Sequence, residues 1–135
     1  MTLKELSQLY WLRREIEKDK QRLEELTASA YSAKIPSMTG MPGGGQVTGS
    51  AVEQKAIAIV EIQKVIEEKM KRCEQERLRL EQYIAGIPDS LTRQIFTLRF
   101  VDGLSWWGVA RGIGGCNTAD GVRKICNRYI DRERG

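Results

Sequence analysis

The sequence predicts an all-α protein in which a long antiparallel helical hairpin, similar to a coiled coil, precedes a small helical domain. Leu, Ile, Glu, Lys and Arg dominate the first 85 residues, a composition typical of long helices. Apolar residues recur there in steps of three and four, the spacing of helices that pack side by side. A shorter region with helix caps and glycine turns follows. We therefore place the domains at residues 1–86 and 87–135.

Composition narrows the classes of protein to consider. The sequence contains no run of about 18 apolar residues and begins without the apolar core of a signal peptide, so we expect a cytoplasmic protein with no membrane partner. The three cysteines, Cys73, Cys116 and Cys126, have irregular spacing and predict buried apolar residues rather than disulfides. There is no histidine and no Cys-x-x-Cys pair, so we expect no metal site and no cofactor. No nucleophile motif or carboxylate cluster suggests an enzyme.

The first helix is expected from Leu3 to Ala28. Thr2 and Glu5 have capping-box spacing, in which each side chain accepts a hydrogen bond from the other residue's backbone N–H. Asp19 interrupts an otherwise apolar seam. The seam consists of Leu9, Leu12, Ile16, Leu23 and Leu26.

Residues 29–49 are expected to form a loop, because they contain two prolines, five glycines and almost no charge. The triple glycine does not match a phosphate-binding loop, since no strand precedes it and no Gly-Lys-Ser/Thr ends it. Apolar residues leave open that part of the loop docks on the helices. These are Tyr31, Ile35, Met38 and Met41.

The second helix is expected from Ser50 to about Ala85, with capping-box spacing between Ser50 and Glu53. Gly86 and Pro88 end it. A helix of this length with one apolar stripe needs a partner, which is either the first helix or a second copy of the chain. The stripe consists of Val52, Ala56, Ile59, Ile66, Met70, Cys73, Leu80 and Ile84.

The C-terminal region predicts three short helices. The first runs from Pro88 to Val101, and Asp102-Gly103 makes a turn. Ser105 is expected to cap the second helix, between Leu104 and Val109 at the spacing of a hydrophobic staple. A glycine turn at 114–115 leads to the third helix, capped by Asn117 or Thr118, with Asp120 placed to favour its N-terminal dipole. Its inward face is expected to hold Val122, Ile125, Cys126 and Tyr129.

This order of elements is that of a helix-turn-helix, whose last helix enters the DNA major groove. Outward side chains of that helix suit base edges and phosphates, although a solvated charged face would look the same. Residues 86–135 hold eight basic and five acidic side chains, a mild positive excess. Two further candidates for contact with DNA, Ser105 and Trp107, lie at the start of the helix expected after the Asp102-Gly103 turn. Trp106 is expected in the core, and Trp107 either at a helix–helix seam or at the phosphate backbone. The candidate DNA-binding residues are Ser105, Trp107, Thr118, Ala119, Arg123, Lys124, Asn127 and Arg128.

Several short motifs carry a resemblance to a known family. They are Met41-Pro42-Gly43, Ile87-Pro88, Leu98-Arg99-Phe100, Gly103-Leu104-Ser105, Val109-Ala110, Asn117-Thr118 and Val122-Arg123-Lys124. Residues 87–115 resemble the last DNA-binding region of bacterial sigma factors, region 4. The whole chain resembles small phage and prophage proteins of sigma-like type. Gly108 replaces the glutamate usual in sigma factors. Together with Gly112, it weakens the helix that Ser105 is expected to cap.

The resemblance implies a phage-encoded transcription regulator that binds double-stranded promoter DNA. Its N-terminal helices would form a homodimer or contact RNA polymerase. Two alternatives stay open. One is a DNA-packaging protein of the small-terminase kind, and the other is an interaction module that binds RNA polymerase without DNA.

Overall fold

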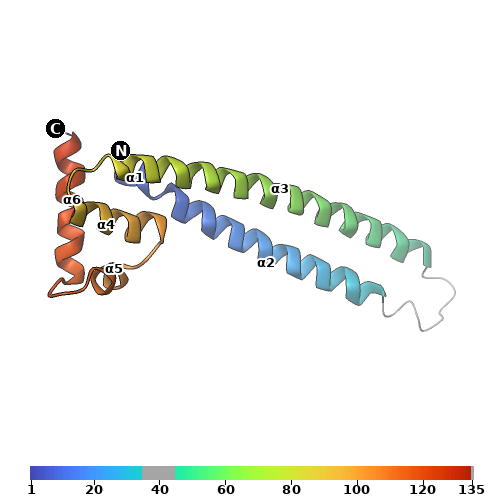
Figure 1. Ribbon diagram of the computed structural model, residues 1–135. Coiled ribbons are helices and arrows are strands. Elements are labelled where there is room, and N and C mark those ends of the chain that lie inside the picture. The colour runs from blue at the N-terminus through green and yellow to red at the C-terminus, as the bar shows by residue number, and fades with distance from the viewer. Residues whose placement is uncertain (35–44, 135) are drawn as a thin grey trace. The chain divides into compact units, whose positions relative to one another are not determined.

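The computed structural model describes residues 1–34 and 45–134, apart from the side chains of residues 32–34 and 45–50. All regular structure in these ranges is helical, as predicted (Figure 1). Within them, no helix combines the length and apolar character needed to cross a membrane. The elements are α1 (Leu3–Leu6), α2 (Gln8–Lys34), α3 (Gly45–Ala85), α4 (Ser90–Phe96), the π-helical turn η2 (Thr97–Val101), α5 (Trp106–Ile113) and α6 (Ala119–Arg134).

The chain begins with the predicted capping box. Thr2 Oγ1 accepts a hydrogen bond from the Glu5 N–H at 3.2 Å, and Glu5 Oε2 accepts one from the Thr2 N–H at 2.9 Å. The single helix expected from Leu3 is divided at Ser7, whose hydroxyl donates to the Leu3 carbonyl at 2.8 Å. A serine hydroxyl that bonds back to a carbonyl four residues earlier often bends a helix, which accounts for the break between α1 and α2.

The predicted loop at 29–49 is too long at both ends. Helix α2 continues to Lys34, and α3 begins at Gly45 rather than at Ser50. Proline disfavours helical geometry in the residue directly before it. Pro36 therefore does not prevent a helix from extending as far as Lys34. Glycines cost a helix about 1 kcal/mol each but do not break it, which explains the early start of α3. The Met41-Pro42-Gly43 motif lies outside the described residues, as do Ile35, Met38 and Met41.

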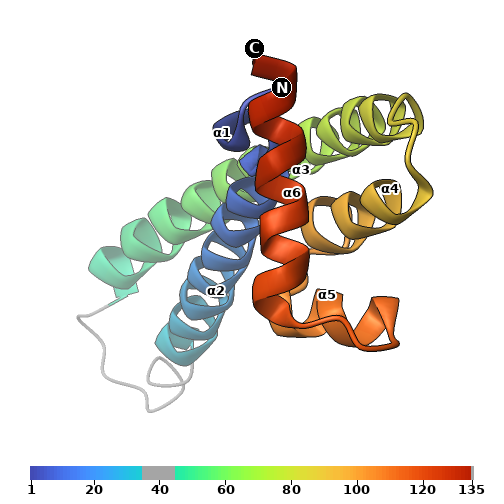
Figure 2. The ribbon, with the colours of Figure 1, turned by 90° about the vertical axis from the view of Figure 1, so that its left-hand side faces the viewer.

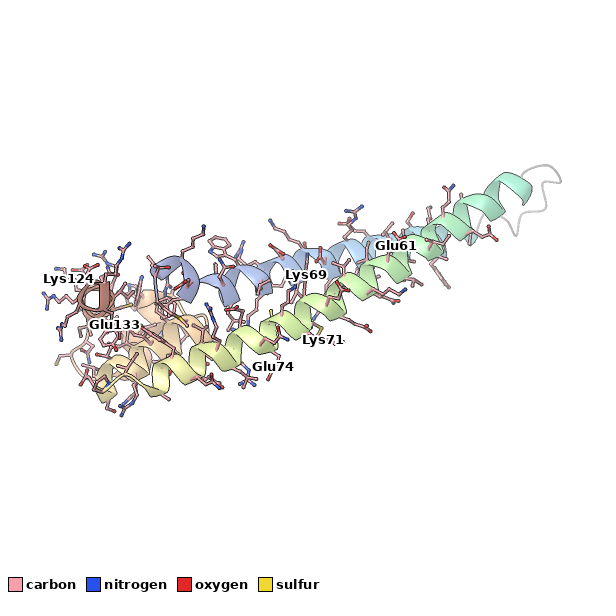
Figure 3. All side chains as sticks on the ribbon, turned by 90° about the horizontal axis from the view of Figure 1, so that it is seen from above. Glu61, Lys69, Lys71, Glu74, Lys124 and Glu133 are labelled. Carbon is pink, nitrogen blue, oxygen red and sulfur yellow. The ribbon has the colours of Figure 1, made fainter. Side chains whose placement is uncertain are left out.

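Residues 14–71 form one compact unit from the parts of α2 and α3 that they contain. Lys69 Nζ donates to Asp19 Oδ2 at 2.6 Å and lies 3.4 Å from Glu15 Oε2. Figure 3 labels Lys69 on the part of α3 that runs alongside α2. Lys55 Nζ donates to Ser29 Oγ at 2.8 Å, so the two helices run in opposite directions. The hydrogen bond to Asp19 raises the pKa of Lys69. The Asp19 carboxylate, which interrupts the apolar seam, is therefore paired with the ammonium group of Lys69 on α3. Among the side chains of this unit that the structure describes, the buried apolar ones are Ile16 and Ile66.

Residues 1–13 and 72–135 form the other compact unit. Its core joins side chains from both ends of the chain, and the Arg13 guanidinium donates to the Val101 carbonyl. Residues 87–135 therefore do not form this core by themselves. The domain boundary that the sequence places at residue 86 stays a prediction. The buried core consists of Leu6, Leu9, Leu80, Ile84, Ile87, Ile95, Phe96, Phe100, Val101, Val109, Ala110, Val122, Cys126 and Ile130.

Phe96 lies at the centre of this core and is fully buried. Its ring contacts those of Phe100 and Tyr129 edge-on, with centroids 5.3 and 5.4 Å away. The helix expected from Pro88 to Val101 begins instead at Ser90, after the Asp89 cap, and widens into η2 after Phe96. A π-turn inserts one residue into a helical turn, and here it leaves both Phe100 and Val101 buried.

The three cysteines differ in their burial. Cys126 is buried in the core, as predicted, and Cys73 is half-buried against it. Cys116 is exposed, so the prediction that it is a buried apolar residue is wrong. The reason is its position in the turn between α5 and α6, where no helical face covers it.

The unit that holds this core is expected to lose stability at alkaline pH. Burial raises the pKa of the Cys126 thiol to about 12, and it also raises the pKa of Tyr83 and Tyr129. An unfolded chain releases these protons at lower pH than the folded chain, so the free energy of unfolding falls above about pH 9. Urea unfolding at several pH values measures this. A Cys126→Ala variant should show a shallower decline, and an identical decline would contradict the assignment to Cys126.

Candidate nucleic-acid interface

The start of α5 is fixed as predicted. Ser105 Oγ accepts a hydrogen bond from the Gly108 N–H at 3.2 Å. Leu104 packs against the core, which contains the buried Val109. The sequence pattern did not indicate Arg99, whose guanidinium donates to the Leu104 carbonyl at 2.9 Å and lies 4.4 Å above the Trp106 ring. Arg99 therefore orients the segment that enters α5.

The two adjacent tryptophans have different surroundings. Trp106 is half-buried and packs against the core under Arg99. Trp107 is 71% exposed, which does not fit the predicted alternative of a helix–helix seam. Neighbouring helical residues point about 100° apart, so only one of the two can face the core. Trp107 is therefore accessible to a partner molecule.

A five-residue turn, 114–118, joins α5 to α6. Gly114 and Gly115 have φ angles of +79° and +67°, a region that residues with a side chain rarely adopt. Asn117 Nδ2 donates to the Gly114 carbonyl at 2.9 Å. Thr118 Oγ1 accepts from the Gly121 N–H at 3.0 Å, so Thr118 rather than Asn117 caps α6. Figure 2 shows α5 beside the N-terminal end of α6 and α4 beside its middle.

Helix α6 divides into the two faces that the sequence predicts. Val122 and Cys126 are buried, and Ile125 and Tyr129 pack against the core. Among the outward candidates, four are exposed and two are half-buried. The exposed residues are Thr118, Arg123, Lys124 and Arg128, and the half-buried ones are Ala119 and Asn127.

A groove of about 620 Å³ lies between α5 and the start of α6. It brings three of the predicted residues together, Trp107, Thr118 and Ala119. It also adds Arg111, which the pattern of the last helix could not indicate because Arg111 belongs to α5. The groove is lined by Trp107, Ala110, Arg111, Gly114, Gly115, Asn117, Thr118, Ala119 and Asp120. Ser105, Arg123, Lys124, Asn127 and Arg128 lie outside its lining.

The charges on this face are partly neutralised. Asp120 Oδ1 lies 2.6 Å from Arg123 Nη2, and Asp120 Oδ2 lies 3.1 Å from Lys124 Nζ. The hydrogen bond from Arg123, followed by that from Lys124, lowers the pKa of Asp120. The carboxylate that the sequence assigns to the helix dipole thus also holds two of the candidate DNA-binding side chains.

The described residues offer no group of three or more acidic, cysteine or histidine side chains that could hold a metal ion. The available chemistry is instead that of guanidinium, ammonium, hydroxyl and amide donors beside an exposed indole. These groups suit the phosphates and base edges of a nucleic acid. In comparisons with known proteins, no family model, curated protein or solved structure matches the chain.

Proposed function

We propose that the protein is a phage-type transcription regulator that binds double-stranded DNA through α5 and α6, acting as a sigma-like helix-turn-helix. The observation that carries the proposal is the outward face of α6, on which Arg123, Lys124 and Arg128 are all exposed. A helix with basic and amide side chains on one face fits the major groove in width and in chemistry.

The predicted DNA-binding side chains have different tasks on α6 and on α5 in this proposal. Arg123, Lys124 and Asn127 read base edges or bind phosphates from α6. Ser105 and Trp107, at the start of α5, contact the phosphate backbone. The modest positive charge supports moderate rather than tight intrinsic affinity, because phosphate contacts supply much of the free energy of DNA binding. A second copy of the chain or a polymerase contact would then add to it.

The N-terminal helices supply that second contact in the proposal. The opposite directions of α2 and α3 and the Lys69–Asp19 pair support an antiparallel, coiled-coil-like hairpin. Such a hairpin suits either a homodimer that reads two half-sites or a contact with RNA polymerase.

An electrophoretic mobility shift with duplex DNA from upstream phage regions tests the proposal. The wild-type chain should shift the duplex at micromolar concentration, within the range of about 1–100 μM usual for non-specific binding. An Arg123→Ala, Lys124→Ala variant should bind at least about tenfold more weakly, because two of its side chains can no longer reach the DNA. Unchanged binding by this variant would remove α6 from the interface.

One observation favours a second candidate, an interaction module that binds a protein. Tyr10 and Trp11 are 40% and 57% exposed and contact each other edge-on at 5.1 Å. Exposed Trp and Tyr side chains are frequent anchors of protein interfaces. Co-purification with RNA polymerase without any DNA affinity would favour this candidate over the regulator.

A further inference from the structure

The side chain of Asp120 is in contact with both basic residues at the centre of the proposed DNA-binding face. It accepts from Arg123, one helical turn later, at 2.6 Å and from Lys124 at 3.1 Å. It also lines the groove between α5 and α6. The three side chains are all exposed, and together they carry one net positive charge instead of two.

We propose that Asp120 is a selectivity residue, which restrains Arg123 and Lys124 and thereby disfavours their binding to DNA phosphates irrespective of base sequence. This inference rests on the proposed function, because it concerns the same face of α6. The partner it addresses is duplex DNA of any sequence, competing with the regulator's target site.

The physical argument is a competition between two anions for the same cations. A phosphate that binds Arg123 or Lys124 must displace the Asp120 carboxylate and also lies close to its negative charge. Like charges across an interface are unfavourable and suppress the wrong partners. A target site compensates for the displaced carboxylate with base-edge hydrogen bonds, whereas a random sequence has none to offer.

A purely structural role for Asp120 predicts the opposite sign. A carboxylate in the first turn stabilises a helix through its dipole, so removing the charge would loosen α6 and weaken DNA binding. The Asp120→Asn variant retains the size of the side chain and removes the charge. An increase in affinity therefore separates the proposed role from a structural one.

The experiment measures fluorescence anisotropy of a labelled random-sequence duplex with the full chain at several salt concentrations. Asp120→Asn should bind more tightly than wild type, by roughly threefold or more at low salt. The slope of log K against log salt should steepen by about 0.9 for each additional phosphate that the variant neutralises. Asp120→Glu, which keeps the charge, should behave as wild type. Asp131→Asn removes a charge from the exposed far end of α6 and is the matched control.

Each outcome decides a specific point. Tighter, steeper binding by Asp120→Asn alone supports the inference, even where wild type binds random DNA too weakly to measure. Equal or weaker binding by Asp120→Asn, with clear binding by wild type, overturns the inference and leaves the proposed function standing. Equal gains in Asp120→Asn and Asp131→Asn would reduce the effect to net charge and overturn it too. No binding by any variant, including to upstream phage DNA, overturns both.

Discussion

Replacing Phe96 by alanine should lower the free energy of unfolding of the unit formed by residues 1–13 and 72–135 by about 3–5 kcal/mol. The ring is fully buried and packs on Phe100 and Tyr129, so truncation removes the transfer free energy of the ring and leaves a cavity. A protein of this size is stable by only about 5–15 kcal/mol, so the variant should be close to unfolding at room temperature.

Urea denaturation followed by circular dichroism measures the effect of Phe96→Ala. Leu91→Ala is the control, because Leu91 lies on the same helix but is 36% exposed, and it should cost well under half as much. Similar decreases in the two variants would show that Phe96 is not at the centre of the core.

Replacing Leu9 by alanine should destabilise α5 and α6, although about 100 residues of sequence separate them from Leu9. The side chain is fully buried in the same core as Val109, Val122 and Cys126, and truncating a buried leucine costs about 2–5 kcal/mol. The two helices of the proposed DNA interface would then depend on the first helical segments for their stability.

Amide hydrogen exchange locates that effect along the chain. Exchange in α5 and α6 should accelerate in Leu9→Ala and remain unchanged in Leu3→Ala, because Leu3 is 51% exposed. Faster exchange confined to α1 and α2 would mean that residues 87–135 are stable by themselves, as the domain boundary predicted from the sequence suggests.

Features that depend on local spacing could be predicted from the sequence. The Thr2–Glu5 capping box and the Ser105 cap each need only a side chain three residues from a backbone N–H. The division of α6 into buried and exposed faces follows from helical periodicity, which placed Val122 and Cys126 inward.

Features that depend on alternatives of similar energy could not be predicted. Ser7 can lie inside a helix or divide it, and its bond to the Leu3 carbonyl decides the outcome. The π-turn after Phe96 has no sequence signal, because it arises from the packing of Phe100 and Val101 in the core.

Some parts of the candidate site could not be predicted because they depend on contacts that form only in the folded chain. The sequence predicts that Gly112 weakens α5, yet a Cβ there would lie 3.0 Å from Leu98 Cδ1, so the lack of a side chain lets α5 lie close to Leu98 of η2. Arg111 enters the candidate site only because the turn at 114–118 folds α5 beside α6. Asp120 is at the spacing of both a dipole effect and an ion pair, and only the folded structure shows that its carboxylate is paired.

The claim that the outward face of α6 binds duplex DNA is tested most directly by the salt dependence of binding. The slope of log K against log salt is negative, and it should become shallower by about 0.9 for each phosphate that the Arg123→Ala, Lys124→Ala variant no longer neutralises. A Lys18→Ala, Lys20→Ala variant removes the same charge from exposed positions on α2 and should leave both slope and affinity close to those of wild type. The contrary result, in which the two variants change the slope equally or the α2 variant changes it more, would place the DNA interface away from α6.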